Sequence, residues 1–65
     1  MPRYFFHVHI DDDVKRDQVG LELPNLDSAV AEAQRAASEI MNEDRLDDLW
    51  LEIMDQSGRL LAKVR

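Results

Sequence analysis

The chain opens with the stretch RYFFHVHI, residues Arg3–Ile10, in which aromatic and β-branched side chains predominate. This composition, read with a period of two, predicts a β-strand. One face of the strand would carry Tyr4, Phe6, Val8 and Ile10, and the other Phe5, His7 and His9. Because both faces carry bulky rings, we expect this strand in the middle of a sheet rather than at its edge.

The residues that follow predict a turn and a weaker second strand. Asp11–Asp13 favour a turn, because aspartate side chains accept hydrogen bonds from nearby backbone N–H groups. Val14–Leu23 is predicted as a strand that breaks near Gly20, where the missing Cβ permits a bulge or a turn. Pro24 ends this strand, since proline has no N–H to donate.

An amphipathic helix is predicted over about Ser28–Asn42, with Asp27 as its N-cap. Its apolar stripe comprises Leu26, Val30, Ala33, Ala37, Ile40 and Met41. The opposite face comprises Glu32, Gln34, Arg35, Ser38, Glu39 and Asn42. The stripe is rich in alanine, so we expect the helix to approach the sheet closely.

Two further strands are predicted after the acidic linker Glu43–Asp48. Leu49–Met54 and Arg59–Arg65 would form a hairpin around a turn at Asp55–Gly58, where Asp and Gly suit the ends of a type I turn. With this four-residue loop the facing pairs are Ile53 with Leu60, Leu51 with Ala62 and Leu49 with Val64.

A three-residue loop would instead set Leu51 opposite Lys63. We prefer the four-residue register, because it separates apolar from polar side chains and a slip of one residue moves a whole face.

These elements predict a single domain, residues 1–65, of the α+β class: a two-layer ββαββ fold with one helix on a four-stranded antiparallel sheet. The expected spatial order is second, first, third, fourth strand. If the helix covers the Leu49, Leu51 and Ile53 side, the outer face carries the candidate interface residues Phe5, His7, Trp50 and Met54. The inverted assignment, with the helix over Trp50, remains an alternative.

Composition narrows the classes of function. Fourteen acidic against eight basic residues give a net charge of −6, which disfavours nucleic acid as a partner. No run approaches the roughly 20 apolar residues that span a bilayer, so no membrane contact is expected. The absence of cysteine excludes disulfides and thiolate zinc sites. We expect a cytoplasmic protein that is mature from Met1.

Few side chains offer chemistry. His7 and His9 project from one face of their strand and could ligate a metal if Glu52 supplied a third ligand, but two imidazoles alone do not make a site. Ser28 and Ser57 fall in a helix start and a turn without a neighbouring base. We therefore expect no catalytic residue, no metal, no cofactor and no enzymatic activity.

Several pieces of the chain carry a resemblance: the opening MPRYFFHV (residues 1–8), GLELP (20–24), LDSA (26–29) followed by alanines, and LEI (51–53) with Asp55 and Gly58. Together they resemble a family of very small uncharacterised proteins from rhizobia and related alphaproteobacteria. The resemblance covers nearly the whole chain and implies a domain of unknown function, so no binding or catalytic residue can be carried over.

A second likeness covers about a third of the chain. The Leu23–Leu26 step into an alanine-rich helix is similar to small antitoxin domains, which would imply an acidic protein that neutralises a basic partner. The acidic stretch Glu39–Asp48 supports that alternative.

The leading expectation is a self-associating interaction module. A fold of this length buries only about 60% of its unfolded surface, and such small domains commonly rely on a partner chain for stability. A homodimer through the outer sheet face would supply that partner. Edge pairing through the last strand is the rival geometry, and we expect Arg59, Lys63 and Arg65 on that strand to disfavour it by repelling their own copies.

Overall fold

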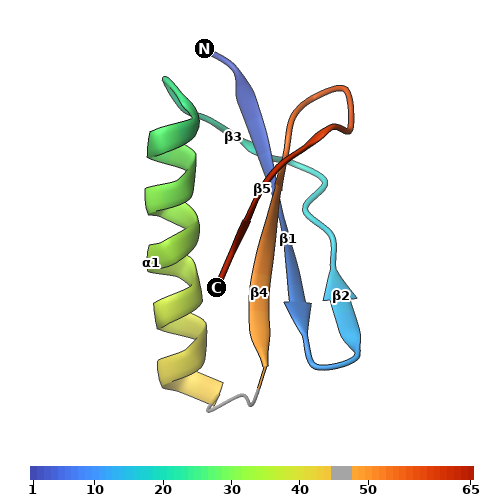
Figure 1. Cartoon of the computed structure of the whole chain (residues 1–65), viewed down its shortest axis with the longest axis vertical. Coiled ribbons are helices and arrows are strands. Elements are labelled where there is room, and N and C mark those ends of the chain that lie inside the picture. Colours follow the sequence, from blue (N-terminus) through green and yellow to red (C-terminus); the bar gives the residue numbers. More distant parts are fainter. Residues whose placement is uncertain (45–47) are drawn as a thin grey trace.

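An antiparallel sheet with one helix against it makes up the structure, a computed structural model that describes residues 1–44 and 48–65 (Figure 1). The described elements are β1 (Arg3–Ile10), β2 (Asp13–Lys15), β3 (Leu21–Glu22), α1 (Leu26–Asp44), β4 (Leu49–Met54) and β5 (Leu60–Val64). The predicted α+β class, with a helix packed on an antiparallel sheet, is confirmed.

The strands lie in the order β2-β1-β4-β5, as predicted, and every neighbouring pair is antiparallel. β1 is central. The predicted second strand is divided in two: β2 pairs with the end of β1, β3 pairs with Arg3 and Tyr4, and residues 16–20 connect them. Gly20, where the break was expected, has a φ of 77°.

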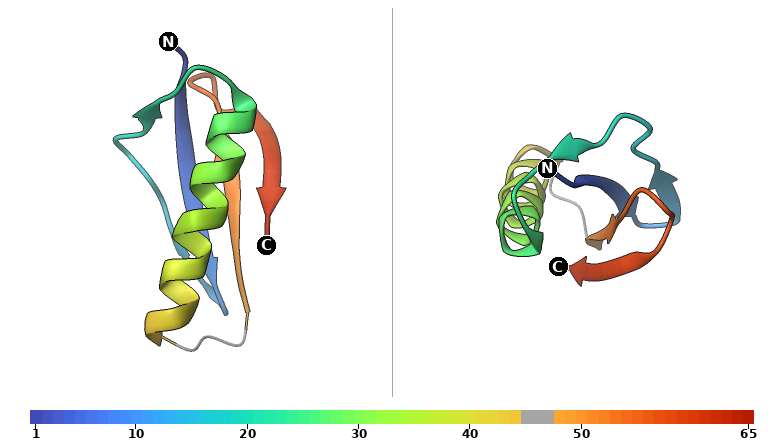
Figure 2. Two further views of the ribbon diagram at one scale, coloured as in Figure 1. Left: turned by 90° about the vertical axis from the view of Figure 1, so that its left-hand side faces the viewer. Right: turned by 90° about the horizontal axis from the view of Figure 1, so that it is seen from above.

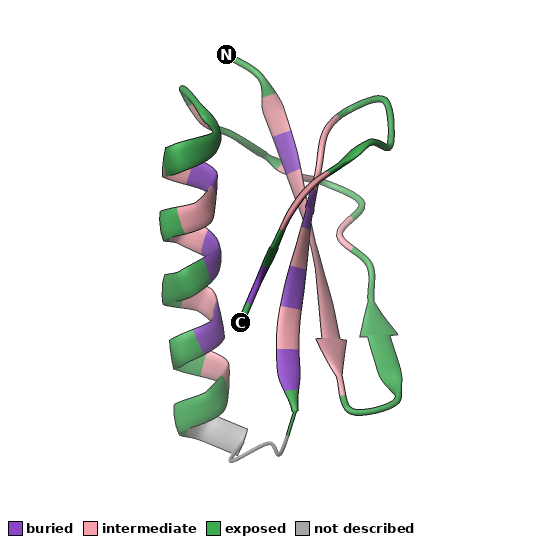
Figure 3. Cartoon of the chain, viewed as in Figure 1, coloured by how far each residue is buried: buried purple, intermediate pink, exposed green. Residues whose placement is uncertain are grey.

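The core lies between α1 and the sheet (Figure 2, Figure 3). β4 alternates between buried and half-buried positions, with Leu49, Leu51 and Ile53 buried on the helix side. The preferred face assignment is therefore confirmed, and the inverted one is wrong. Leu51 and Ile53 are the largest fully buried side chains described, so this core is small.

Helix α1 begins at Leu26, two residues before the predicted start. The Asn25 side-chain oxygen accepts the Ser28 N–H at 2.9 Å, and its carbonyl accepts the Ala29 N–H at 3.2 Å. Asn25 is thus the N-cap, and the prediction of Asp27 was wrong: Asp27 lies in the first turn, where its charge still favours the helix dipole.

The buried stripe of α1 consists of Ala29, Ala33 and Ala37. The predicted stripe omitted Ala29 and included Met41, which is 40% exposed. Because alanines alone form the buried line, the helix backbone approaches the sheet closely, as expected.

The β4–β5 register differs from the prediction by two residues. Leu51 pairs with Val64 and Ile53 with Ala62, and a bulge lies at the Ile53–Met54 step. The five-residue turn, residues 55–59, accounts for one residue of the shift, and the bulge accounts for the other. In this turn the Asp55 carboxylate accepts the Ser57 and Arg59 N–H groups at 2.9 Å each. A shift of two keeps Ala62 and Val64 on the helix side.

The predicted acidic turn is a tight hairpin in which Ile10 pairs with Asp13. Asp11 has a φ of 51°, and its N–H donates to the Asp48 carbonyl at 3.0 Å. Residues 45–47 of the predicted acidic stretch lie outside the described residues. In the described parts of the chain, no helix is long and apolar enough to cross a membrane.

Candidate functional site

The four predicted interface residues come together on the sheet face opposite α1. β1 and β4 pair so that Phe5 lies beside Met54, His7 beside Glu52 and His9 beside Trp50. Phe5, His7, Trp50 and Met54 are all half-buried rather than fully exposed. We call these four residues, with His9 and Glu52, the outer face.

Residues 16–20, which connect β2 to β3 along the edge of β1, cover part of the outer face. We call these residues the strap. The Asp17 carboxylate accepts the Phe6 N–H at 3.2 Å and the Val19 and Gly20 N–H groups at 3.0 Å each. The Asp17 N–H donates to His7 Nδ1 at 3.0 Å. One side chain therefore joins the strap to the middle of β1.

The environment of Asp17 favours its charged form. Partial burial would raise the pKa of this carboxyl, but the N–H groups of Gly20, Phe6 and Val19 hold the pKa below its ordinary value. The strap is thus fastened by a carboxylate that stays ionised.

Gly20 brings the strap into contact with Phe5. A Cβ on Gly20 would lie 2.8 Å from Arg3 Cγ and 2.9 Å from Phe5 Cε1, closer than real Cβ atoms approach, and 3.0 Å from the Tyr4 carbonyl oxygen. Phe5 and His7 are therefore covered within the chain, because residues 16–20 lie against both.

Trp50 is held by polar neighbours. The His9 imidazole stacks on its ring, with centroids 3.8 Å apart and planes 7° apart, and Lys63 Nζ lies 5.1 Å from the ring centroid. His9 Nε2 donates to Glu52 Oε1 at 2.5 Å. This hydrogen bond, with the charges of His9, His7 and Lys63, outweighs partial burial and lowers the pKa of Glu52.

Both histidines use one ring nitrogen within the chain. Asp17 occupies His7 Nδ1 and Glu52 occupies His9 Nε2. Among the described residues, no group of three or more His, Cys, Asp or Glu side chains has the arrangement of a metal site.

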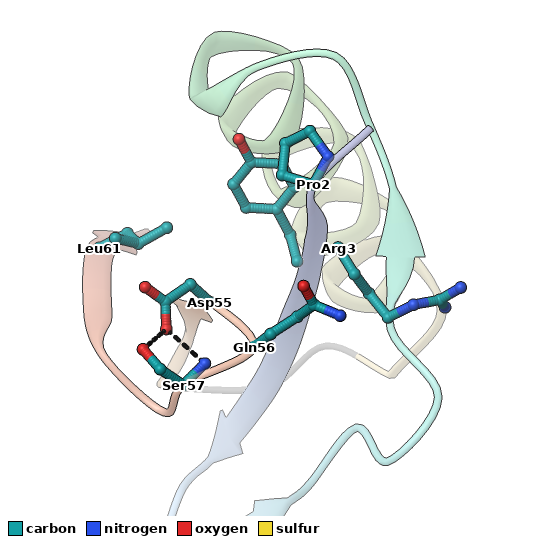
Figure 4. A pocket seen from close by; sticks show the side chains of 7 residues that line it. Pro2, Arg3, Asp55, Gln56, Ser57 and Leu61 are labelled. Carbon is teal, nitrogen blue, oxygen red and sulfur yellow. Dashed lines mark hydrogen bonds between the residues drawn. The ribbon is translucent and has the colours of Figure 1, made fainter.

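A shallow cavity of about 300 Å³ lies at the other end of the sheet, lined by Pro2, Arg3, Tyr4, Asp55, Gln56, Ser57 and Leu61 (Figure 4). The Asp55 carboxylate accepts hydrogen bonds from the Ser57 N–H and the Ser57 hydroxyl, both within its own turn. Arg3 points away from that turn and binds the Val19 carbonyl and Glu22. The side chains of Asp55, Ser57 and Arg3 thus make their hydrogen bonds within the fold.

Sequence reasoning missed Asp17 as an organising residue. The spacing Asp17–Gly20, an aspartate three residues before a glycine, is a turn signal that could have identified it. The His9 stack on Trp50 and the place of Lys63 depend on register across three strands, which local patterns do not carry.

Comparison of the sequence with known protein families identifies the family of this chain. No curated protein and no solved structure matches the chain. One family model, described as Domain of unknown function (DUF6894), matches residues 3–65, nearly the whole chain, and confirms the expectation of a domain of unknown function. This chain belongs to the DUF6894 family.

Proposed function

We propose that the chain is a non-enzymatic interaction module whose partner is a second copy of itself, bound through the outer face. The proposed compartment is the cytoplasm, because small extracellular domains usually carry disulfides and this chain has no cysteine. The net charge of −6 makes a protein a more favourable partner than a nucleic acid or an anionic membrane.

The observation that carries the proposal is the burial of β1. This strand is central in the sheet and rich in aromatic residues, yet Tyr4 is its one buried residue and the other seven are half-buried. Complete burial of a large apolar side chain stabilises by roughly 1.5 to 3 kcal/mol relative to exposure. Part of this free energy remains to be gained at Phe5, Trp50 and Met54, and a symmetric contact with a second copy would gain it.

The test is the sedimentation velocity of the wild type and Trp50→Glu at tens of micromolar. We expect the wild type to self-associate and the variant to sediment as a smaller species than the wild type, because a carboxylate at this position would have to be desolvated in the contact. Ala31→Glu, which places the same charge on the exposed side of α1, is the matched control and should leave the mass unchanged. A wild type that sediments as a monomer would refute self-association.

A second candidate, an acidic module for a basic protein partner, is favoured by one observation. The hydrogen bond from Asp11 N–H to the Asp48 carbonyl brings the Asp11–Asp13 turn beside Asp48, so four acidic residues gather at one end. Fluorescence titration with a lysine-rich peptide tests it. Asp12→Lys should bind the peptide more weakly, with a smaller salt dependence, than the wild type. Binding of the wild type that does not change with salt concentration would count against this candidate.

A further inference from the structure

The edge of the sheet formed by β5 is open. In the described residues β5 pairs with β4 alone, and it ends the strand order (Figure 1). Leu60, at its start, is 44% exposed. An edge strand presents unpaired N–H and C=O groups that can pair with another strand.

Beside this edge, α1 presents a surface without charge. A cavity of about 450 Å³ lies between Arg65, directly after β5, and the helix residues Gln34, Ala37, Ser38, Met41 and Asn42. Leu26 and Val30 continue the same side of the helix toward its start, at helical spacing from Gln34. We call Leu26, Val30, Gln34, Ala37 and Met41 the flank.

The flank is partly apolar and open. Leu26 is 37% exposed and Met41 40% exposed. In a chain with a net charge of −6, all five flank residues are uncharged, whereas Glu32, Arg35 and Glu39 pair with one another elsewhere on the helix surface. Two copies with like net charge approach most easily where charge is missing.

We propose that a second copy docks at β5, so that the two β5 strands pair antiparallel about a two-fold axis and the two flanks pack together. The proposal rests on the proposed self-association, but it uses a surface separate from the outer face, on the helix side of the sheet. With both contacts made, four copies could assemble.

The spacing of the elements suits this arrangement. Helix α1 packs over β4 and β5. Its axis would then lie about one strand spacing, ~5 Å, from the line midway between β5 and its copy. Two helices related by that line would be about 10 Å apart, which is the ordinary distance between packed helices.

Charges on β5 select the register. Lys63 opposite its own copy would be repulsive, as like charges across strands destabilise pairing. A register centred on Ala62 instead sets Lys63 opposite the partner's Leu61. The remaining like pair, Arg59 and the partner's Arg65, lies beyond the strand ends, and Asp55 beside Arg59 offsets it.

The same register brings Gln34 near the axis. Arg65 faces the helix around residue 38, and Ala62 lies three strand residues earlier, about 10 Å along β5. That length equals six or seven helix residues, so the axis meets α1 within the turn that precedes or includes Gln34.

Single cysteines test the contact, since the chain has none of its own. Under mild oxidation, Gln34→Cys should form a disulfide-linked dimer at least tenfold faster than Glu39→Cys, which lies on the charged, exposed side of α1 away from the flank. The same preference should persist when Trp50→Glu is added, because an outer-face dimer holds the two helices apart on opposite sides. Equal rates for the two cysteines would overturn the docking at β5, whatever Trp50→Glu does.

Hydrogen exchange of Leu60–Val64 is the second measurement, and it needs no cysteine substitution. Raising the protein concentration from about 1 to 100 μM should slow exchange of the outward N–H groups of β5 at least tenfold, in the wild type and in Trp50→Glu alike. Exchange that is independent of concentration in both would overturn the inference. A wild type that loses self-association on Trp50→Glu would still support the proposed function, so the two failures are distinguishable.

Discussion

Replacing Asp17 by alanine should reduce the free energy of unfolding by about 2 to 3 kcal/mol. The carboxylate accepts three backbone N–H groups, from Phe6, Val19 and Gly20. A hydrogen bond to a charged group contributes roughly 1.5 to 3 kcal/mol when both partners are shielded. Because Asp17 is half-buried, water can replace part of these hydrogen bonds. We therefore expect the three bonds together to contribute about as much free energy as one fully shielded bond. Asp17→Asn keeps an acceptor oxygen, so about half of the loss is expected.

The assay is urea unfolding at fixed protein concentration, followed by Trp50 fluorescence. Asp12→Ala is the control, because Asp12 is exposed in the hairpin turn. The pKa of Asp17 is lower in the folded chain than in the unfolded chain, so the folded state binds fewer protons and gains stability as the pH rises. The advantage of the wild type over Asp17→Asn should thus be full above the unfolded pKa of about 3.9 and shrink as the pH falls below it. An Asp17→Ala variant as stable as Asp12→Ala would refute the fastening of the strap.

Two further substitutions test the packing. Ala33→Leu should lower the free energy of unfolding by about 1 to 3 kcal/mol through overpacking, because Ala33 is fully buried against the sheet. Ala31→Leu, on the exposed side of the helix, should change it by less than about 0.5 kcal/mol. Urea unfolding measures both variants. Gly20→Ala should lower the melting temperature by about 8 °C or more, since a φ of 77° and the contact with Phe5 together cost about 2 kcal/mol; an unchanged thermal melt would contradict the close approach of the strap.

Elements with a strong local pattern were predictable. The bounds of β1 and β4 are those of the predicted strands, because alternation over six to eight residues reports a half-buried strand directly. The helix side of the sheet followed from the same alternation at Leu49, Leu51 and Ile53.

The N-cap of α1 and the β4–β5 register were predicted wrongly because each depends on hydrogen bonds between a side chain and the backbone. Asn25 and Asp27 are both residue types that are favoured as N-caps. Which of them is the N-cap depends on which one has non-helical backbone angles directly before the first helical residue. The hairpin register depended on Asp55, whose carboxylate binds two N–H groups and holds a longer turn than residue preferences indicate. Neither decision is visible in the pattern of apolar residues.

The outer face was predictable in membership but not in exposure. Period two places Phe5, His7, Trp50 and Met54 on one side, as the structure does. Their cover depends on the strap and on the His9 stack, which are contacts between residues far apart in the chain. Local sequence patterns do not encode such contacts.

The division of the second strand also sets how far edge pairing can proceed. On the side of the sheet away from β5, β2 and β3 offer only three and two residues, and the Asp17 carboxylate occupies the interval between them. An incoming strand would find no continuous template there, only a short ladder that carries Asp13 and Lys15. In the described residues, an added strand therefore finds its longest edge template at β5. The division of this strand into two short pieces therefore disfavours edge-to-edge polymerisation on this side of the sheet.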